Sequence, residues 1–215
     1  GNESTIKSYL TRMCGIGVRE NFMKTYIENV FHLKATVTPD PTLLLETHEW
    51  DNLIERPTQK VPDKYILIYS LMSIKEVIKL ASEIAHKMKL PLLHINVNRR
   101  LGYWKQKGID FNMNEATPGE FLWLYKHATF IITNTFHGNM FAVIFRKDFV
   151  HINLVKDDNR ITTLHQNIKF NNDRIISNID DFNKISPHIN YEQYEQHIAQ
   201  FRQKGLDFIN HCINS

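Results

Sequence analysis

The feature that most constrains the fold is a regular alternation of short β-rich runs and amphipathic helical segments after residue 63. The β-rich runs are Tyr65–Tyr69, Leu92–Val97, Phe130–Thr133 and Phe149–Asn153. The helical segments between them are Ser73–Lys89, Pro118–His127 and Gly138–Phe145. This alternation is typical of parallel βαβ units. We therefore predict an α/β fold with a doubly wound, Rossmann-like parallel sheet flanked by helices.

The segments on either side of this alternation have other patterns. Apolar spacing predicts a helix over Ile6–Met13, a short strand at Ile16–Val18 and a second helix over residues 20–33. The two prolines of Pro39–Pro41 exclude a regular element there. The tail, Tyr191–Ile213, predicts one long helix or two short ones.

Composition excludes several classes of protein. Hydrophobic residues make up 42% and charged residues 23% of the 215 residues, which are globular rather than disordered values. The charge of +3 comes from 26 basic and 23 acidic residues that are interspersed, so we expect no nucleic-acid partner. Cys14 and Cys212 form no C-x-x-C pair and predict neither a disulfide framework nor a structural zinc site.

Neither a signal peptide nor an apolar stretch of about 20 residues occurs in this sequence, so we expect a soluble, cytoplasmic protein. The sequence begins abruptly, at Gly1, with a helical pattern. We therefore expect it to be part of a longer protein.

The loops at the carboxyl ends of the predicted strands are the expected ligand sites of an open parallel sheet. They follow Tyr69, Val97 and Thr133. The third loop, Thr133–Asn139, leads into a helix whose first turn attracts anions. In this loop Gly138 permits close approach to the backbone, and His137 can donate a hydrogen bond, carry charge or move a proton. The alternative is that His137 only caps or packs the turn.

Other polar residues are weaker candidates. Arg19 and Arg160 could each hold an anion through a guanidinium fork, or lie in solvent as most arginines do. Glu120 is best explained by the helix dipole in a first turn. Asp157–Asp158 could hold a metal but is more simply a solvated turn, so we expect no metal site. No dinucleotide, P-loop, zinc-protease or hydrolase-elbow motif occurs.

Four stretches, taken in order, carry a family resemblance. They are Gly15–Glu20, Pro39–Leu45, Thr117–Leu122 and Ile132–Gly138, the last running on to Phe145–Lys147. Together with Arg160–Ile161 and Asp173–Arg174 they resemble the polysaccharide pyruvyl transferase family.

The resemblance implies the C-terminal half of a two-domain transferase of the GT-B type. Residues 1–62 would then be a domain-junction segment, with helices and short strands from the end of the N-terminal domain. Residues 63–215 would be the C-terminal, Rossmann-like, donor-binding domain with its terminal helices. A missing N-terminal domain would be this chain's partner.

The resemblance also implies a chemistry. The donor substrate would be phosphoenolpyruvate, with no cofactor, and the acceptor a sugar or lipid-linked oligosaccharide of a cell-surface or capsular polysaccharide. Binding of a lipid-linked acceptor would place the protein at the membrane periphery. The product would be a pyruvate ketal on two sugar hydroxyls.

Carried over residue by residue, the resemblance makes His137 the catalytic candidate. It makes Thr135, Phe136, Gly138 and Arg19 donor-binding candidates, with Arg160 a further anion ligand. Some relatives have Arg-Leu-His-Gly where this chain has the segment 135–138. The charge that this arginine would supply then has to come from Arg160, from Arg19 or from the helix dipole.

Two other functions remain open on the sequence. A GT-B glycosyltransferase that uses a nucleotide-sugar donor would have the same architecture, because a fold does not determine function. A module that binds an anion or a sugar without catalysis is the second alternative.

Overall fold

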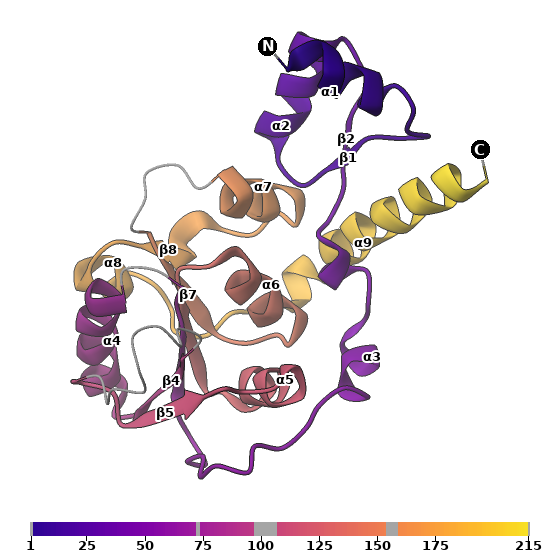
Figure 1. Ribbon diagram of the computed structural model, residues 1–215. Coiled ribbons are helices and arrows are strands. Elements are labelled where there is room, and N and C mark those ends of the chain that lie inside the picture. Colours follow the sequence, from indigo (N-terminus) through magenta and orange to yellow (C-terminus); the bar gives the residue numbers. More distant parts are fainter. Residues whose placement is uncertain (1, 72–73, 97–106, 154–158, 215) are drawn as a thin grey trace. The chain divides into compact units, whose positions relative to one another are not determined.

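The computed structural model describes residues 2–71, 74–96, 107–153 and 159–214 (Figure 1). By contacts between Cα atoms the chain divides into two compact units. One, here called the sheet unit, comprises Glu46–Lys156 and Asn172–Ile189. The other, the terminal unit, comprises Gly1–Leu45, Asp157–Asn171 and Asn190–Ser215. The expected domain boundary after residue 62 stays a prediction.

The sheet unit contains a six-stranded sheet in which every neighbouring pair is parallel. Its strands are β3 (Ile66–Tyr69), β4 (Leu92–Asn96), β5 (Phe111–Asn114), β6 (Phe130–Thr133), β7 (Phe149–Ile152) and β8 (Ile175–Ile176). The predicted α/β fold with a parallel sheet is therefore confirmed.

The strand order, β5-β4-β3-β6-β7-β8, reverses direction between β3 and β6. In register, Ile66 lies beside Phe130, and Tyr69 beside Thr133 at the carboxyl ends of the two strands. Such a reversal is the topological switch point of a doubly wound sheet, outside which ligands bind. Two of the three predicted ligand loops, after Tyr69 and after Thr133, begin at this point. The third, after Val97, lies outside the described residues.

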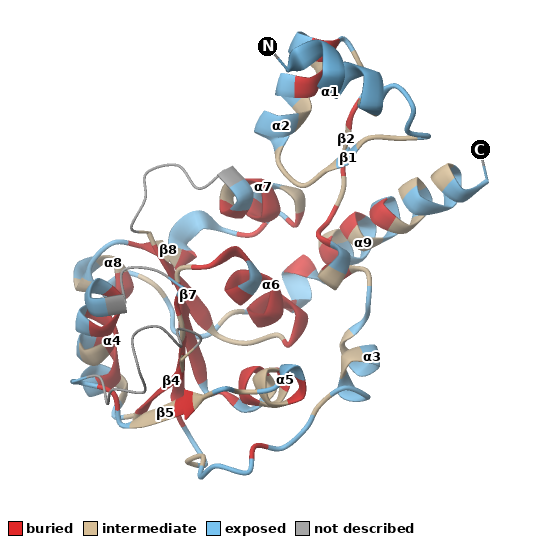
Figure 2. Cartoon of the chain, in the orientation of Figure 1, coloured by how far each residue is buried: buried red, intermediate tan, exposed pale blue. Residues whose placement is uncertain are grey.

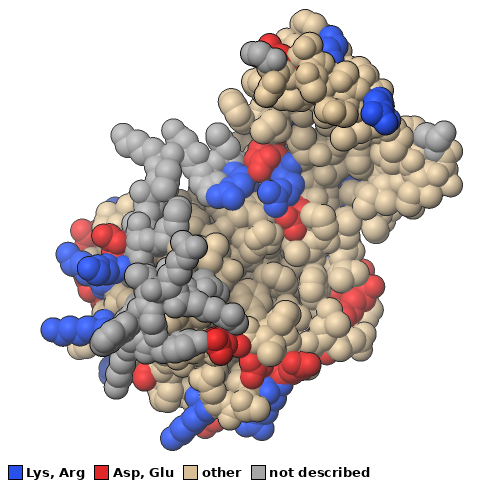
Figure 3. All heavy atoms as spheres, viewed as in Figure 1, with Lys and Arg blue, Asp and Glu red and all other residues tan. Residues whose placement is uncertain are grey.

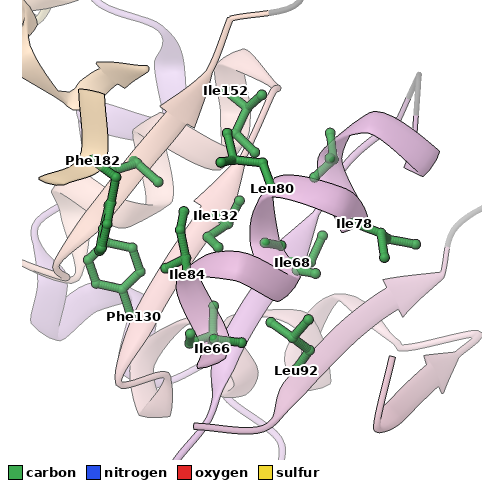
Figure 4. Packing of buried hydrophobic residues seen from close by; sticks show 14 of the residues in the cluster. Ile66, Ile68, Ile78, Leu80, Ile84, Leu92, Phe130, Ile132, Ile152 and Phe182 are labelled. Carbon is green, nitrogen blue, oxygen red and sulfur yellow. The ribbon is translucent and has the colours of Figure 1, made fainter. Parts of the chain in front are cut away.

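Helices cover both faces of this sheet (Figure 1). On one face lie α4 (Ile74–Met88) and α8 (Ile179–Asn183), and on the other α5 (Pro118–His127) and α6 (Phe136–Ile144). A short helix, α3 (Thr47–Asp51), precedes the first strand. Val77, Ala81 and Ile84 of α4 are fully buried. Ile84 belongs to the same core cluster as Ile66 and Ile132 of the strands (Figure 4). The central strands β3, β6 and β7 and the helix α6 are almost wholly buried (Figure 2).

The terminal unit is assembled from three separate stretches of the chain. Its elements are α1 (Glu3–Leu10), β1 (Gly17–Val18), α2 (Asn21–Tyr26), a π-helical turn (Ile27–Phe31), β2 (Thr36–Val37), a 3-10 helix (Pro41–Leu43), α7 (Asn159–Asn167) and α9 (Glu192–Ile213). β1 and β2 form a small parallel pair. Ile27, Phe31 and Ala35 form a small core there.

Several elements differ from the prediction. The strands β5 and β8 were not expected, and a 3-10 helix begins at Pro41 because proline fits the first helical position. The tail forms one helix, α9, through Gly205, which is buried. A side chain at Gly205 would meet the ring of Pro39 at 2.6 Å, so close packing explains this glycine.

Among the described residues no helix is both long and apolar enough to cross a membrane.

Candidate functional site

The turn after β6 is fastened to the end of β3. The hydroxyl of Thr133 donates a hydrogen bond to the carbonyl oxygen of Tyr69 at 2.7 Å. The backbone N–H of Thr135 in turn donates to the Thr133 hydroxyl oxygen at 3.1 Å. The two strand ends that flank the switch point are thus held in one hydrogen-bonded arrangement.

Thr135 is the N-cap of α6. Its side-chain oxygen accepts a hydrogen bond from the backbone N–H of Gly138 at 2.9 Å, which satisfies one of the unpaired donors of the first turn. The helix therefore begins at Phe136, two residues before the predicted start at Gly138. As a result His137 lies within the first turn and is exposed, while Thr135, Phe136 and Gly138 are buried.

Gly138 is needed for close packing. A Cβ atom at this position would lie 2.0 Å from the Thr133 hydroxyl oxygen and 2.7 Å from that of Thr135. Both threonine side chains therefore occupy the space that any other residue would need. The absence of a side chain lets the helix start directly against the end of β6.

Two buried polar side chains, those of Asn139 and His151, help to hold the same turn in place. The side-chain amide of Asn139 donates to the carbonyl oxygen of Thr135 at 2.8 Å. The same nitrogen lies 2.8 Å from Nδ1 of His151 on β7. Asn139 is fully buried and His151 is 3% exposed. Buried polar groups that pair in this way fix one conformation. The sequence analysis missed both residues, because neither carries a motif.

A cavity of about 830 Å³ opens beside His137 within the sheet unit. Its wall is mainly aromatic and aliphatic, with the residues Trp50, Leu53, Glu55, Tyr69, Ala116, Thr117, Pro118, Gly119, Phe121, Leu122, His137 and Phe141. Concave, mostly apolar pockets with a few polar groups are the usual sites for small ligands. We refer to it as the aromatic pocket.

Part of its rim is the first turn of α5. The hydroxyl oxygen of Thr117 accepts from the backbone N–H of Glu120 at 3.1 Å, and the carboxylate of Glu120 accepts from the backbone N–H of Thr117 at 2.9 Å. This reciprocal pair is a capping box. The structural interpretation of Glu120 is thereby confirmed.

Arg19 and Arg160 belong to the terminal unit, whereas His137 belongs to the sheet unit. The guanidinium of Arg19 donates to the carboxylate of Asp40 at 2.7 Å. Asp40 is 5% exposed and also accepts from the backbone N–H of Thr42. Pairing with a buried carboxylate fixes the position of one guanidinium nitrogen.

Arg160 is exposed in the first turn of α7. That helix contacts the start of α2, where the backbone N–H of Asn21 donates to the Thr163 hydroxyl at 3.3 Å. The structure thus brings the helix that carries Arg160 to a segment only two residues beyond Arg19.

A model of the polysaccharide pyruvyl transferase family matches residues 1–154. The chain belongs to this family. No curated protein matches it significantly. The family match begins in the terminal unit and includes the turn around His137, the aromatic pocket and the segment of Arg19, but it ends before Arg160.

The fold is similar to that of a solved structure of another protein. The UDP-GlcNAc 2-epimerase of Methanocaldococcus jannaschii, solved with UDP-GlcNAc and UDP, matches 88% of this chain at 15% identity and a TM-score of 0.51. This chain spans 61% of the epimerase. A glycosyltransferase of kitacinnamycin matches 70% of this chain and 41% of its own length, at 11% identity and a TM-score of 0.40. By its likeness to the epimerase, this chain has the expected Rossmann-like fold of the GT-B type.

The residues that the structure describes contain no group of three or more histidines, cysteines or acids placed to hold a metal ion. Asp157–Asp158 lies outside the described residues.

Proposed function

We propose that this pyruvyl transferase moves a pyruvyl group from phosphoenolpyruvate to two hydroxyls of a sugar, as a ketal, in the synthesis of a cell-surface or capsular polysaccharide. Family membership supports the transfer of a pyruvyl group. The observation that carries the assignment of the site is the exposed His137 in the first turn of α6, at the switch point between β3 and β6.

The start of α6 suits an anionic donor. The N-terminus of a helix carries a partial positive charge, and its first N–H groups point outward toward a ligand. Gly138 and the cap by Thr135 place this helix end directly at the end of β6. We assign the phosphate or carboxylate of phosphoenolpyruvate to this turn, with Phe136 and Gly138 contributing backbone and His137 contributing its ring.

The chemistry requires two bond-forming steps at C2 of the donor. A proton adds to the methylene carbon while one sugar hydroxyl attacks C2 and loses its own proton. A second hydroxyl then attacks C2 as the C2–O bond to phosphate breaks, and the proton of this hydroxyl goes to the departing phosphate. His137 is the general acid of the first step or a ligand of the leaving phosphate, and a histidine suits either role near neutral pH. Arg19 and Arg160 stay candidates for further anion ligands.

The acceptor follows from the same assignment. We propose a sugar or lipid-linked oligosaccharide as the acceptor, and a cytoplasmic protein that meets the membrane through it. We propose no resident cofactor, since phosphoenolpyruvate carries the leaving group that the transfer displaces.

The decisive variant is His137→Ala. We expect phosphate release from phosphoenolpyruvate in the presence of acceptor to fall by about 100-fold or more, the usual loss for a general acid. Because His137 is exposed, the free energy of unfolding should change by less than about 0.5 kcal/mol. His86→Ala, on an exposed position of α4, is the matched control. Unchanged turnover in His137→Ala would remove the residue from the mechanism.

A further inference from the structure

We propose that the aromatic pocket binds the sugar ring of the acceptor, so that the sheet unit holds donor and acceptor side by side. This inference rests on the proposed function, since it names the second substrate of the same site. It places acceptor contacts in the sheet unit of this chain.

The wall of the pocket offers aromatic surfaces to a ring-shaped ligand. The rings of Tyr69 and Phe121 meet edge to face with centroids 5.1 Å apart, and those of Trp50 and Phe141 at 5.3 Å. Edge-to-face contacts fix the orientation of the rings. Tyr69, Phe121 and Trp50 line the pocket and are half-buried, so their side chains are partly accessible. The apolar C–H face of a hexose can pack against such a surface.

Glu55 supplies a polar contact at the rim. One of its carboxylate oxygens accepts from the Thr117 hydroxyl at 3.1 Å, and its backbone N–H donates to the carbonyl of Gly119 at 3.1 Å. Within the part of the chain that the structure describes, the other carboxylate oxygen has no partner. Glu55 is exposed, so this oxygen can accept from a sugar hydroxyl.

The position of Glu55 depends on Gly119. A Cβ atom at Gly119 would lie 2.6 Å from Cγ and 2.8 Å from Cβ of Glu55. The Glu55 side chain therefore packs across the backbone at the start of α5. This close approach gives a second way to disturb the pocket without touching its aromatic wall.

The charge of the wall selects the class of ligand. Glu55 is the acidic side chain among the lining residues, and His137, which also belongs to the donor turn, is the lining side chain that can carry a positive charge. A carboxylate repels the phosphate and carboxylate of phosphoenolpyruvate, and apolar surface does not solvate them. A sugar is a neutral polyol with one apolar face, so the carboxylate does not repel it and the apolar surface can pack against it. His137 lies both in this wall and in the proposed donor turn, so a bound sugar hydroxyl would lie next to the reacting carbon.

The direct test is saturation-transfer NMR on the 215-residue chain without phosphoenolpyruvate. Aromatic protein resonances are irradiated, and transfer is followed to methyl glycosides of glucose, galactose, mannose and N-acetylglucosamine. We expect transfer to the ring protons of at least one glycoside. Glu55→Gln and Gly119→Ala should each weaken its binding by about tenfold, because each removes or displaces one charge-assisted hydrogen bond. Glu76→Gln, exposed on α4, should have no effect.

A protein that gives no transfer to any glycoside would overturn the inference. So would glycoside binding that is equal in Glu55→Gln, Gly119→Ala and the wild type, or transfer only to a nucleotide such as UDP. Because the measurement needs no phosphoenolpyruvate, it is independent of the donor. Glycoside binding together with no binding of phosphoenolpyruvate would support the pocket and contradict the proposed reaction.

Discussion

Thr135 determines where α6 begins and therefore where His137 lies. Its hydroxyl accepts from Gly138, and its carbonyl oxygen accepts from the Asn139 side chain. Thr135 itself was expected to bind the donor. In the structure its side chain is 7% exposed and caps α6, and its contact with the donor stays a prediction.

Replacing Thr135 tests the cap. Thr135→Ala leaves the Gly138 N–H without its acceptor, and we expect the free energy of unfolding to fall by about 1 kcal/mol. Thr135→Ser keeps the hydroxyl and should stay close to the wild type. Urea denaturation measures both. Equal stability of the alanine and serine variants would contradict the role as a cap.

Gly138→Ala tests the close packing at the switch point. The new methyl group would overlap the Thr133 hydroxyl, and we expect a loss of about 1–3 kcal/mol in unfolding free energy. In a Thr133→Ala background the same change should cost less, because the overlapping atom is gone. Thermal denaturation of both single variants and the double variant measures this coupling. Strictly additive losses would rule out the overlap as the cause.

Among single residues, sequence reasoning identified His137 and Gly138 because both belong to a strand-to-helix turn with a recognisable motif. It could not identify Glu55. Glu55 and Thr117 form a hydrogen bond although they are 62 positions apart in the sequence. The residues next to Glu55 in the sequence have the pattern of a polar linker. His151 and Asn139 were missed because their pairing depends on the parallel alignment of β6 and β7.

At the scale of elements, β4 carries a buried titratable group. His94 is 3% exposed, and burial lowers the pKa of its imidazole. The unfolded chain has the ordinary value near 6.5. As the pH falls below that value, the unfolded state takes up a proton at His94 while the buried imidazole in the folded state stays neutral. The free energy of unfolding therefore decreases as the pH falls from about 6.5 toward the lower pKa of the folded state.

We therefore expect the free energy of unfolding to decrease between pH 7.5 and pH 5.5. His94→Leu should show a smaller decrease over the same range, since it removes one group that takes up a proton on unfolding. Urea titrations at the two pH values give both quantities. An identical decrease in the wild type and the variant would mean that His94 does not titrate in this range.

Elements with a strong local pattern of apolar residues could be predicted from the sequence. β3 and β6 are continuous apolar runs with every residue but Tyr69 buried, so they stood out in the sequence. β5 has the sequence Phe-Asn-Met-Asn with one buried residue, and β8 has only two residues, so tertiary pairing determines both. The helix α9 continues through Gly205 because tertiary packing there outweighs the low helix propensity of glycine.

For the whole molecule, the parallel βαβ pattern sufficed to predict the fold class, and the ordered motifs sufficed to predict the family. The division into compact units was not predictable, because the terminal unit joins residues from three separate stretches. On the face shown in Figure 3, Lys and Arg are interspersed with Asp and Glu, in agreement with the charge pattern of the sequence. Among the residues that the structure describes on this face, the basic side chains form no broad surface of one sign.

The central claim is that this chain binds phosphoenolpyruvate at the turn that carries His137. Calorimetric titration of phosphoenolpyruvate into the wild type and into His137→Ala, at low ionic strength and with UDP-GlcNAc as the comparison ligand, tests it most directly. We predict that the wild type binds phosphoenolpyruvate and that His137→Ala loses at least about tenfold in affinity, or about 1.4 kcal/mol. Binding of UDP-GlcNAc alone, or phosphoenolpyruvate binding that is equal in both proteins, would contradict the claim.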